Sequence, residues 1–222
     1  FPAHTYLHPK PPYDPNDLSP IARVTTTIVS MSVPAVLNIN SMKDLIARAK
    51  AEPGQLTWAT VTGATDFVFA GWLKMDGLDM LKVPYRDPVT ALNDLSENRI
   101  QVFNSAYAIV RAQAEAGRVR VLAVTNRERA EAIPNIPTVA EVGAPGLLFD
   151  GLVGMYGTRD LPNEVRARIA ADIKEIAADP AIRTRIIATG QGVTPCTSAE
   201  LAAAIAGHSR GLEAAPTALV VK

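Results

Sequence analysis

Short apolar segments alternate with turn residues from residue 22 to residue 125 of the chain. These segments are rich in β-branched and aromatic side chains, which is typical of strands. The last of them, Val-Arg-Val-Leu-Ala-Val-Thr, is almost continuously apolar, as expected of a strand that is buried on both faces of a parallel sheet. The pattern predicts strands over residues 22–31, 56–60, 81–85, 100–103 and 119–125.

Helical patterns lie between the predicted strands. Ser41 is placed to cap a helix that stops at Pro53-Gly54, and Asp87-Pro88 begins another. Residues 104–117 indicate a turn followed by a helix with Gly117 as its C-cap. The apolar positions expected on the buried faces are Leu45, Ile46 and Ala49 in the first helix and Val89, Leu92 and Leu95 in the second.

This alternation predicts an α/β fold with a mainly parallel sheet, because parallel neighbours must be joined by crossover connections. Ligands of such sheets bind beyond the carboxyl ends of the strands. Here those ends are residues 60–66, 85–87 and 104–107. We therefore expect these three loops to lie along one rim of the sheet.

The first of these loops is small and polar. Its residues 62–66, Thr-Gly-Ala-Thr-Asp, lead into a helix that is apolar almost all round, which indicates burial, and that ends at Gly77. Unpaired N–H groups and the helix dipole at such a start favour an anion. The turn carries no phosphate-loop or dinucleotide-binding motif. The simpler interpretation is an ordinary strand-to-helix turn in which Thr65 or Asp66 is the N-cap.

After residue 125 the regular alternation of predicted strands and helices is interrupted. Residues 126–146 contain three prolines and look like a crossing between two lobes. A strand interrupted by glycines follows in Leu-Leu-Phe-Asp-Gly-Leu-Val-Gly-Met-Tyr-Gly. Three helices are then predicted: one after Pro162 with Val165, Ile169, Ile173 and Ile176 on its apolar face, one from Asp179-Pro180 to Gly190, and one after the capping box from Thr197 to Glu200.

Composition narrows the possible functions. The 222 residues are 48% hydrophobic, so one large or two modest globular cores can form. The chain carries 22 basic and 22 acidic residues, and this balance gives no nucleic-acid-binding charge pattern. No apolar stretch approaches the roughly 20 residues that span a bilayer. The single cysteine, Cys196, excludes a disulfide within these residues and fits a small buried or half-buried position.

The residues that could do chemistry show no catalytic or metal-binding pattern. His4, His8 and His208 lack metal-ligand spacing, and no group of cysteines and histidines suits zinc. No Gly-x-Ser-x-Gly elbow is present for acyl transfer. Asp76 and Asp79 fit solvated turn carboxylates better than a catalytic pair. We therefore expect no catalysis, no cofactor and no metal site.

Five segments in order carry a resemblance that spans nearly the whole chain. They are YDPNDLSPIARV, AKAEPGQLTWATVTGAT, VPYRDPVTALNDL, EAGRVRVLAVTNRERAEAIPNIPTVAEVGAPG and DLPNEVRARIAADI. Together they resemble the substrate-binding proteins of tripartite tricarboxylate transporters, the Bug family of periplasmic proteins. The most specific parts are the Val-Pro-Tyr strand with its following helix, and the Leu-Ala-Val-Thr strand that leads into Pro-Thr-Val-Ala-Glu.

The resemblance implies a type II periplasmic-binding-protein fold. In this fold two α/β lobes with mainly parallel sheets are joined by two crossing strands, and the lobes close on a small carboxylate by a hinge motion. Residues 1–33 and 144–222 would form lobe one, and residues 34–143 would form lobe two. Family members begin with a strand and a glycine-rich loop that these residues lack, so we expect residues ahead of Phe1 in the mature protein.

The resemblance also implies that ligand contacts come chiefly from backbone amides and bridging waters, with one loop from each lobe. Asp66 stands where relatives more often have serine, and we expect it to point away as a helix cap. Arg86 stands where relatives often have lysine, and we favour a surface ion pair with Asp87 or a neighbour over ligand contact. The implied ligand-binding residues are Ala3, His4, Thr5, Thr60, Thr62, Gly63, Ala64, Thr65, Asn104, Ser105, Ala106, Tyr107 and Asp150.

The implied function is that of a monomeric periplasmic receptor that captures a small organic acid, with a dicarboxylate favoured. The receptor would deliver this acid to the membrane components of a tripartite tricarboxylate transporter, perform no reaction and bind no nucleic acid. Two alternatives stay open. One is an effector-sensing domain of a regulator or sensor with the same bilobal fold, although no DNA-binding helix-turn-helix segment is visible. The other is an α/β enzyme that uses a helix N-terminus to hold a phosphate or carboxylate substrate.

Overall fold

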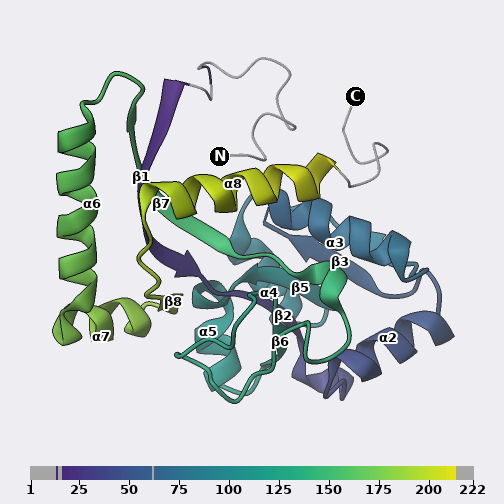
Figure 1. The fold of residues 1–222 in the computed structure, drawn as a ribbon. Helices are drawn as coiled ribbons and strands as arrows, with labels where there is room; N and C mark the ends of the chain where they lie inside the picture. The colour runs from purple at the N-terminus through teal and green to yellow at the C-terminus, as the bar shows by residue number, and fades with distance from the viewer. Residues whose placement is uncertain (1–13, 15–16, 62, 214–222) are drawn as a thin grey trace. The chain divides into compact units, whose positions relative to one another are not determined.

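The structure, a computed structural model, describes residue 14, residues 17–61 and residues 63–213. The chain divides into two compact units (Figure 1). Unit 2 is Ile28–Asp150, and unit 1 combines Phe1–Thr27 with Gly151–Lys222. The lobe boundaries expected near residues 33 and 144 stay a prediction.

The sheet of unit 2 contains β2 (Val29–Pro34), β3 (Thr57–Thr60), β4 (Leu81–Lys82), β5 (Val102–Ala106) and β6 (Val119–Val124). In the described residues its strand order is β4-β3-β5-β2-β6. Strand β3 pairs in parallel with β4 and β5, whereas β2 pairs antiparallel with β5 and β6. All of these strands except β2 therefore run in one direction, as the expected mainly parallel sheet requires.

The helices of unit 2 are α2 (Met42–Ala51), α3 (Ala64–Met75), α4 (Pro88–Ser96) and α5 (Tyr107–Glu115), with short 3₁₀ turns η2 (Ala35–Leu37) and η3 (Pro145–Leu147). Two predicted caps are confirmed. The Ser41 side chain accepts a hydrogen bond from the Asp44 N–H at the start of α2, and Asp87 accepts from the Val89 and Thr90 N–H groups at the start of α4.

Three sequence-based boundaries are wrong. The strand predicted over residues 22–31 is two strands, β1 (Leu18–Thr27) and β2, with a break at Ile28. The strand predicted over residues 81–85 is only β4, with two residues. The turn predicted at the start of residues 104–117 is the end of β5, because residues 104–106 still pair with β2.

Side chains that alternate along the strands build one hydrophobic core on each face of the unit 2 sheet. On the first face, Trp58 and Val102 join a cluster that includes Phe69 and Trp72 of α3. On the second face, Ala59 and Phe103 join a cluster that includes Leu95 of α4 and Val110 of α5. We call these the α3 face and the α5 face. Since successive residues of a strand point to opposite faces, the parity of a residue decides which core it enters.

The buried face of α4 differs from the predicted one at a single residue, Val89. Val89 was expected on that face, but 58% of it is exposed. Leu95 is fully buried and Leu92 packs partly buried against the α5-face core, as predicted, and Ala91, one helical turn before Leu95, is buried in place of Val89. The apolar spacing was compatible with either Val89 or Ala91 beside Leu92 and Leu95, and the packing against the sheet selects Ala91.

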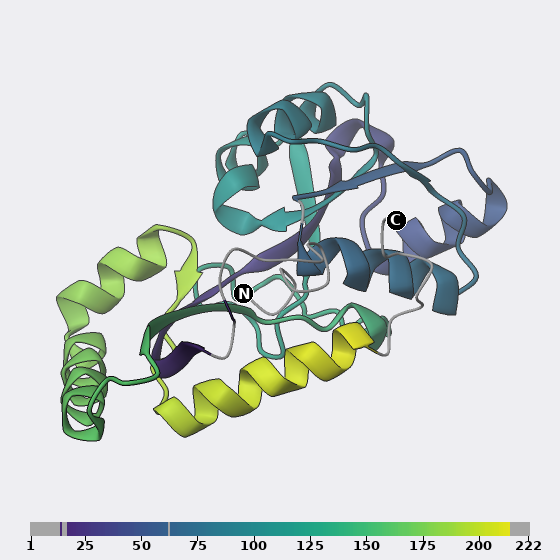
Figure 2. The same ribbon diagram turned by 90° about the horizontal axis from the view of Figure 1, so that it is seen from above.

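Unit 1 contains a sheet of order β7-β1-β8, with β7 at Gly151–Thr158 and β8 at Gln191–Gly192. Strand β1 pairs antiparallel with both neighbours. Its helices are α6 (Asn163–Ala178), α7 (Pro180–Ala188) and α8 (Ser198–Glu213). Figure 2 shows α6 and α8 as separate helices, and each of them packs against β1.

The predicted apolar face of α6 is only partly covered. Val165 is 43% exposed and Ile176 is 52% exposed, so these two apolar residues of the predicted helix lie largely at its surface. Ala177 is the buried residue of this helix. Cys196 is half-buried, as expected. Among the helices that the structure describes, none is long and apolar enough to cross a membrane.

The corrected face of α4 predicts a sharp contrast between two substitutions. Leu95→Ala should lower the free energy of unfolding by about 2–5 kcal/mol, because it opens a cavity in the α5-face core. Val89→Ala, on the exposed side of the same helix, should change it by less than about 0.5 kcal/mol. Urea denaturation followed by circular dichroism measures both values. Equal losses for the two variants would show that the sequence-based face was the correct one.

Candidate functional site

The candidate site begins with two strand residues that lie opposite each other. Thr60 at the end of β3 pairs with Asn104 of β5 in the parallel register. Two residues earlier, Trp58 pairs with Val102, and both enter the α3-face core. By alternation, the side chains of Thr60 and Asn104 lie on this same face. Thr60 and Asn104 are 5% and 1% exposed, so they form a buried polar pair at the end of the sheet where α3 begins.

Helix α3 begins earlier than expected. Its N-cap is Gly63, with φ of 133°, and no side chain caps the first turn. The interpretation that Thr65 or Asp66 is the N-cap is therefore wrong. The physical reason is the backbone of Gly63, because a positive φ that other residues avoid lets the helix start directly after it. The Asp66 N–H donates to the Gly63 carbonyl at 3.2 Å, and the N–H groups of the residues before it precede the first intrahelical acceptor, so this end can serve an anion.

Asp66 lies in the first turn of α3 and is already compensated. Its carboxylate accepts a hydrogen bond from Thr60 Oγ1 at 3.0 Å and forms an ion pair with Lys82 Nζ at 2.6 Å. Lys82 also lies 5.6 Å from the centroid of the Trp58 ring. The negative charge that was difficult to reconcile with an anion site is thus balanced by Lys82. It also lies at the end of the helix where a carboxylate is favourable.

The sequence did not point to Lys82. A carboxylate in the first turn of a helix beside a possible anion site was the available signal, since it requires a nearby cation. The partner could not be chosen, because it depends on the register between β3 and β4, which places Lys82 opposite Trp58. Arg86, the other candidate cation, is exposed and forms no ion pair within the described residues. The oxygens of Asp87 cap α4 instead.

Asn104 carries the least usual feature of the site. Its Oδ1 atom is buried and has no hydrogen-bond partner within the part of the chain that the structure describes. Buried polar atoms in native proteins are nearly always paired, so this acceptor requires an explanation. It belongs to a side chain on the α3 face, beside Thr60 and at the end where α3 begins.

The remaining residues of the second loop face elsewhere. Ser105 is buried on the α5 face opposite Ser30, whose hydroxyl donates to the Ser105 carbonyl at 3.3 Å. Ala106 is the N-cap residue of α5. Tyr107 packs into the α5-face core, and burial raises the pKa of its hydroxyl. The structure therefore brings Thr60, Asn104 and the start of α3 together, and separates from them the side chains of Ser105 and Tyr107.

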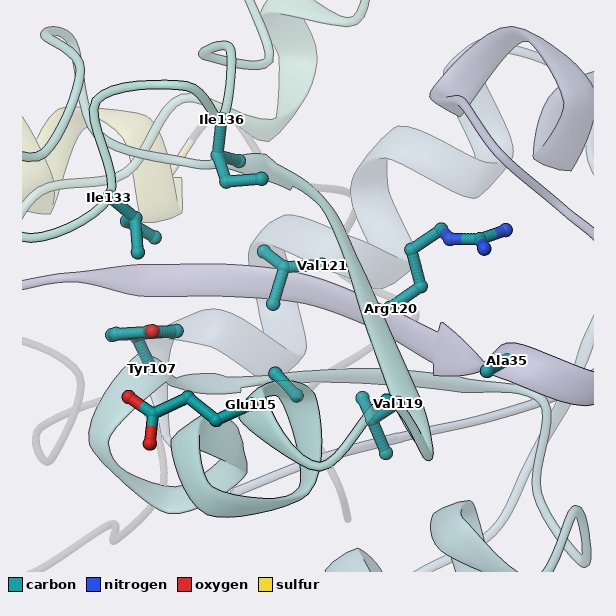
Figure 3. Close-up of a pocket in the computed structure, with 10 residues that line it drawn as sticks. Ala35, Tyr107, Glu115, Val119, Arg120, Val121, Ile133 and Ile136 are labelled. Carbon is teal, nitrogen blue, oxygen red and sulfur yellow. The ribbon is translucent and has the colours of Figure 1, made fainter.

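Tyr107 lines a different hollow, of about 350 Å³, along α5 and β6 (Figure 3). Its other walls are mostly apolar and include Ile133, Ile136 and Val121. The two charged residues of the hollow already have partners. Glu115 is paired with Arg111, and Arg120 donates to the Asn40 side chain. Glu115 is therefore neutralised by an opposite charge, whereas the guanidinium of Arg120 donates to the neutral Asn40 side chain and Ile39 carbonyl.

Asp150 ends unit 2 and is held by the segment that follows β6. Its carboxylate accepts from the Arg127 N–H at 3.1 Å and from Asn126 Nδ2 at 3.4 Å, and it pairs with Arg127 Nε at 3.3 Å. Asn126 in turn accepts from the buried Val29 N–H at 3.1 Å. Asn126 therefore links the first strand of unit 2 to its last residue. Its side chain was not identified from the sequence.

Several expected site residues lie outside the described residues, namely Ala3, His4, Thr5 and Thr62. Within the described ranges, no group of histidine, cysteine, aspartate and glutamate residues is arranged to hold a metal ion.

Comparisons with known proteins identify a family. Residues 1–212 match the model of the tripartite tricarboxylate transporter family receptor. A UPF0065 protein of a Pseudomonas species is 29% identical over 179 residues, which are 79% of this chain and 53% of the relative. BugT of Bordetella pertussis is 24% identical over 192 residues, which are 85% of this chain and 58% of BugT. The chain spans about half the length of the curated relatives that it matches.

Solved structures share the fold. An R. palustris protein with adipate has a TM-score of 0.79 at 22% identity, and the match covers 90% of this chain and 68% of that chain. MatC of Rhodopseudomonas palustris with bound malate has a TM-score of 0.75 at 20% identity, and the match covers 95% and 74%. At these identities the likeness establishes the fold, and it confirms the expected α/β periplasmic-binding class.

Asn126 provides a test of the links that hold Asp150. Asn126→Ala should lower the free energy of unfolding by about 1–3 kcal/mol, because the buried Val29 N–H loses its acceptor. Asn93→Ala, which removes an exposed amide from α4, is the matched control and should cost less than about 0.5 kcal/mol. Urea denaturation gives both numbers. If Asn126→Ala proved as harmless as the control, Asn126 would have no structural role at this position.

Proposed function

The chain belongs to the receptor family of tripartite tricarboxylate transporters, and on this premise we propose that it captures a small organic acid in the periplasm. The acid is handed to the membrane components of a transporter, and the receptor acts as a monomer without catalysing a reaction. Because the chain spans about half of its curated relatives, this function refers to the whole protein of which these residues are a part.

The uncapped start of α3 is the observation that carries this proposal. Helix α3 is 12 residues long, and its first-turn N–H groups lie next to the buried polar pair of Thr60 and Asn104. Such a start provides hydrogen-bond donors and a partial positive charge for one carboxylate. The negative charge of Asp66 does not cancel this partial positive charge, because Lys82 forms an ion pair with the Asp66 carboxylate.

The proposed ligand is a dicarboxylate or a closely related acid. Two proteins of the same fold are described with adipate and with malate, which are both dicarboxylates. In this proposal, the amides of Gly63, Ala64 and Thr65 bind one carboxylate. The other expected contacts are Ala3, His4, Thr5, Thr62, Ala106 and Asp150 with the backbone of Ser105 and Tyr107.

The number of contacts is sufficient for a receptor. A hydrogen bond to a charged group contributes on the order of 1.5–3 kcal/mol. Two or three of these supply much of the roughly 8 kcal/mol that corresponds to a micromolar dissociation constant. A site of this strength retains its ligand and can still release it, which a transport receptor must do.

Gly63 is the position at which the proposal is tested. Gly63→Val should weaken acid binding by about tenfold or more, because a β-branched residue cannot keep the φ of 133° that aims the first N–H groups of α3. Among the described residues, no atom beyond the neighbouring backbone lies within 4 Å of the added Cβ, so the effect would come from the backbone conformation and not from a clash. The measurement is calorimetric titration with C4 to C8 dicarboxylates, keto acids, amino acids and sugars.

Gly77→Val is the matched control. Gly77 also has a positive φ, of 63°, and also has free space around its Cβ, but it follows the opposite end of α3. This variant should lose stability while it keeps the parent affinity for the acid. Tight binding of a neutral sugar with no binding of any acid would contradict the proposal, and so would full affinity in Gly63→Val.

A further inference from the structure

The threonine hydroxyl groups of the candidate site already donate their hydrogen bonds within the protein. Thr60 Oγ1 donates to the Asp66 carboxylate, which can only accept, at 3.0 Å. Thr65 Oγ1 donates to the Val61 carbonyl at 3.0 Å. Each hydroxyl therefore has only lone pairs left for a ligand. Neither can donate a hydrogen bond to a ligand carboxylate while these contacts last.

Asn104 adds a third acceptor at the same place. Its buried Oδ1 atom has no partner within the described residues, and its side chain lies beside Thr60 at the end of the sheet where α3 begins. A buried acceptor without a donor costs free energy that a ligand donor can recover. Both the unpaired Oδ1 of Asn104 and the lone pairs of Thr60 Oγ1 can therefore accept a hydrogen bond from a donor on the ligand.

The site consequently has two parts with opposite requirements. The first-turn N–H groups of α3 require an acceptor, which a carboxylate provides. Asn104 Oδ1 and Thr60 Oγ1 require a donor, which a carboxylate lacks. We propose that the ligand is a hydroxy carboxylic acid whose carboxylate binds the start of α3 and whose hydroxyl donates to the acceptors of Asn104 and Thr60. This inference rests on the proposed function and specifies its ligand class.

Electrostatics favour a hydroxyl over an ammonium as the donor. Lys82 Nζ already occupies the Asp66 carboxylate at 2.6 Å, so the carboxylate has a cation. The start of α3 adds a partial positive charge. A ligand ammonium beside these groups would be repelled, whereas a neutral hydroxyl would not. An amino acid should therefore bind less tightly than the hydroxy acid of the same carbon skeleton.

Matched ligand pairs test the inference in calorimetric titrations of the protein. Malate is compared with succinate, and 2-hydroxyadipate with adipate, so that each pair differs by one hydroxyl. The hydroxy acid of at least one pair should bind roughly tenfold or more tightly than its partner, as expected when a buried acceptor gains a donor. Aspartate, which replaces the hydroxyl of malate by an ammonium, should bind less tightly than malate.

Two variants assign the preference to its residues. Asn104→Leu removes the amide with little change in volume, and Thr60→Val removes the hydroxyl. Each should reduce the preference for the hydroxy acid to within about threefold. The readout is the ratio of the two affinities within one variant, so a loss of affinity shared by both acids does not enter it. Thr57→Val is the matched control on the same strand, since Thr57 bonds Gln101 instead, and it should keep the full preference. Using two variants keeps the test decisive if one of them fails to fold.

The possible outcomes separate this inference from the proposed function. If the acids bind but the hydroxyl makes no difference, or the plain acid binds more tightly, the inference is overturned and the proposed function stands. Tighter binding of aspartate than of malate would also overturn the choice of a hydroxyl. If no acid binds at all, both are overturned together. A preference that survives in both Asn104→Leu and Thr60→Val would refute the assignment to these acceptors.

Discussion

The parallel pairing of β3 with β5 is the constraint on which the candidate site depends. It places Trp58 opposite Val102 in the α3-face core and, two residues later, Thr60 opposite Asn104 on the same face. One strand register therefore fixes the position of both pairs, the apolar pair in the core and the polar pair beside the start of α3. A shift of the β3 register by one residue would turn Thr60 toward the α5 face and would move the apolar side chains of β3 out of the core that they now enter. The hydrophobic core thus holds the polar groups in position.

Features that follow from neighbouring residues could be predicted from the sequence. The caps at Ser41 and Asp87 satisfy N–H groups two or three residues away, so the short pattern contains the whole interaction. The alternation of strands and helices also predicted the α/β class, because each element buries a face that its own residues define. The small polar turn after β3 was recognised for the same reason.

Features that depend on distant partners could not be predicted. Lys82 reaches Asp66 only because β4 pairs with β3, and apolar periodicity does not specify that register. The unpaired Oδ1 of Asn104 becomes visible only when the neighbours on every side are known. The exposed Val89 of α4 has a similar origin, because a helix with several apolar positions can turn more than one stripe toward the sheet.

The position of Lys82 has a consequence for how such receptors diverge. The loop that presents the N–H groups and the cation that balances Asp66 belong to different segments, and β4 has only two residues, both exposed. A single replacement at position 82 would change the electric field at the start of α3 while leaving every residue of the turn between β3 and α3 intact. If the start of α3 binds the acid as we propose, selection can alter ligand preference through a short edge strand, and sequence comparisons restricted to the turn after β3 would miss the change.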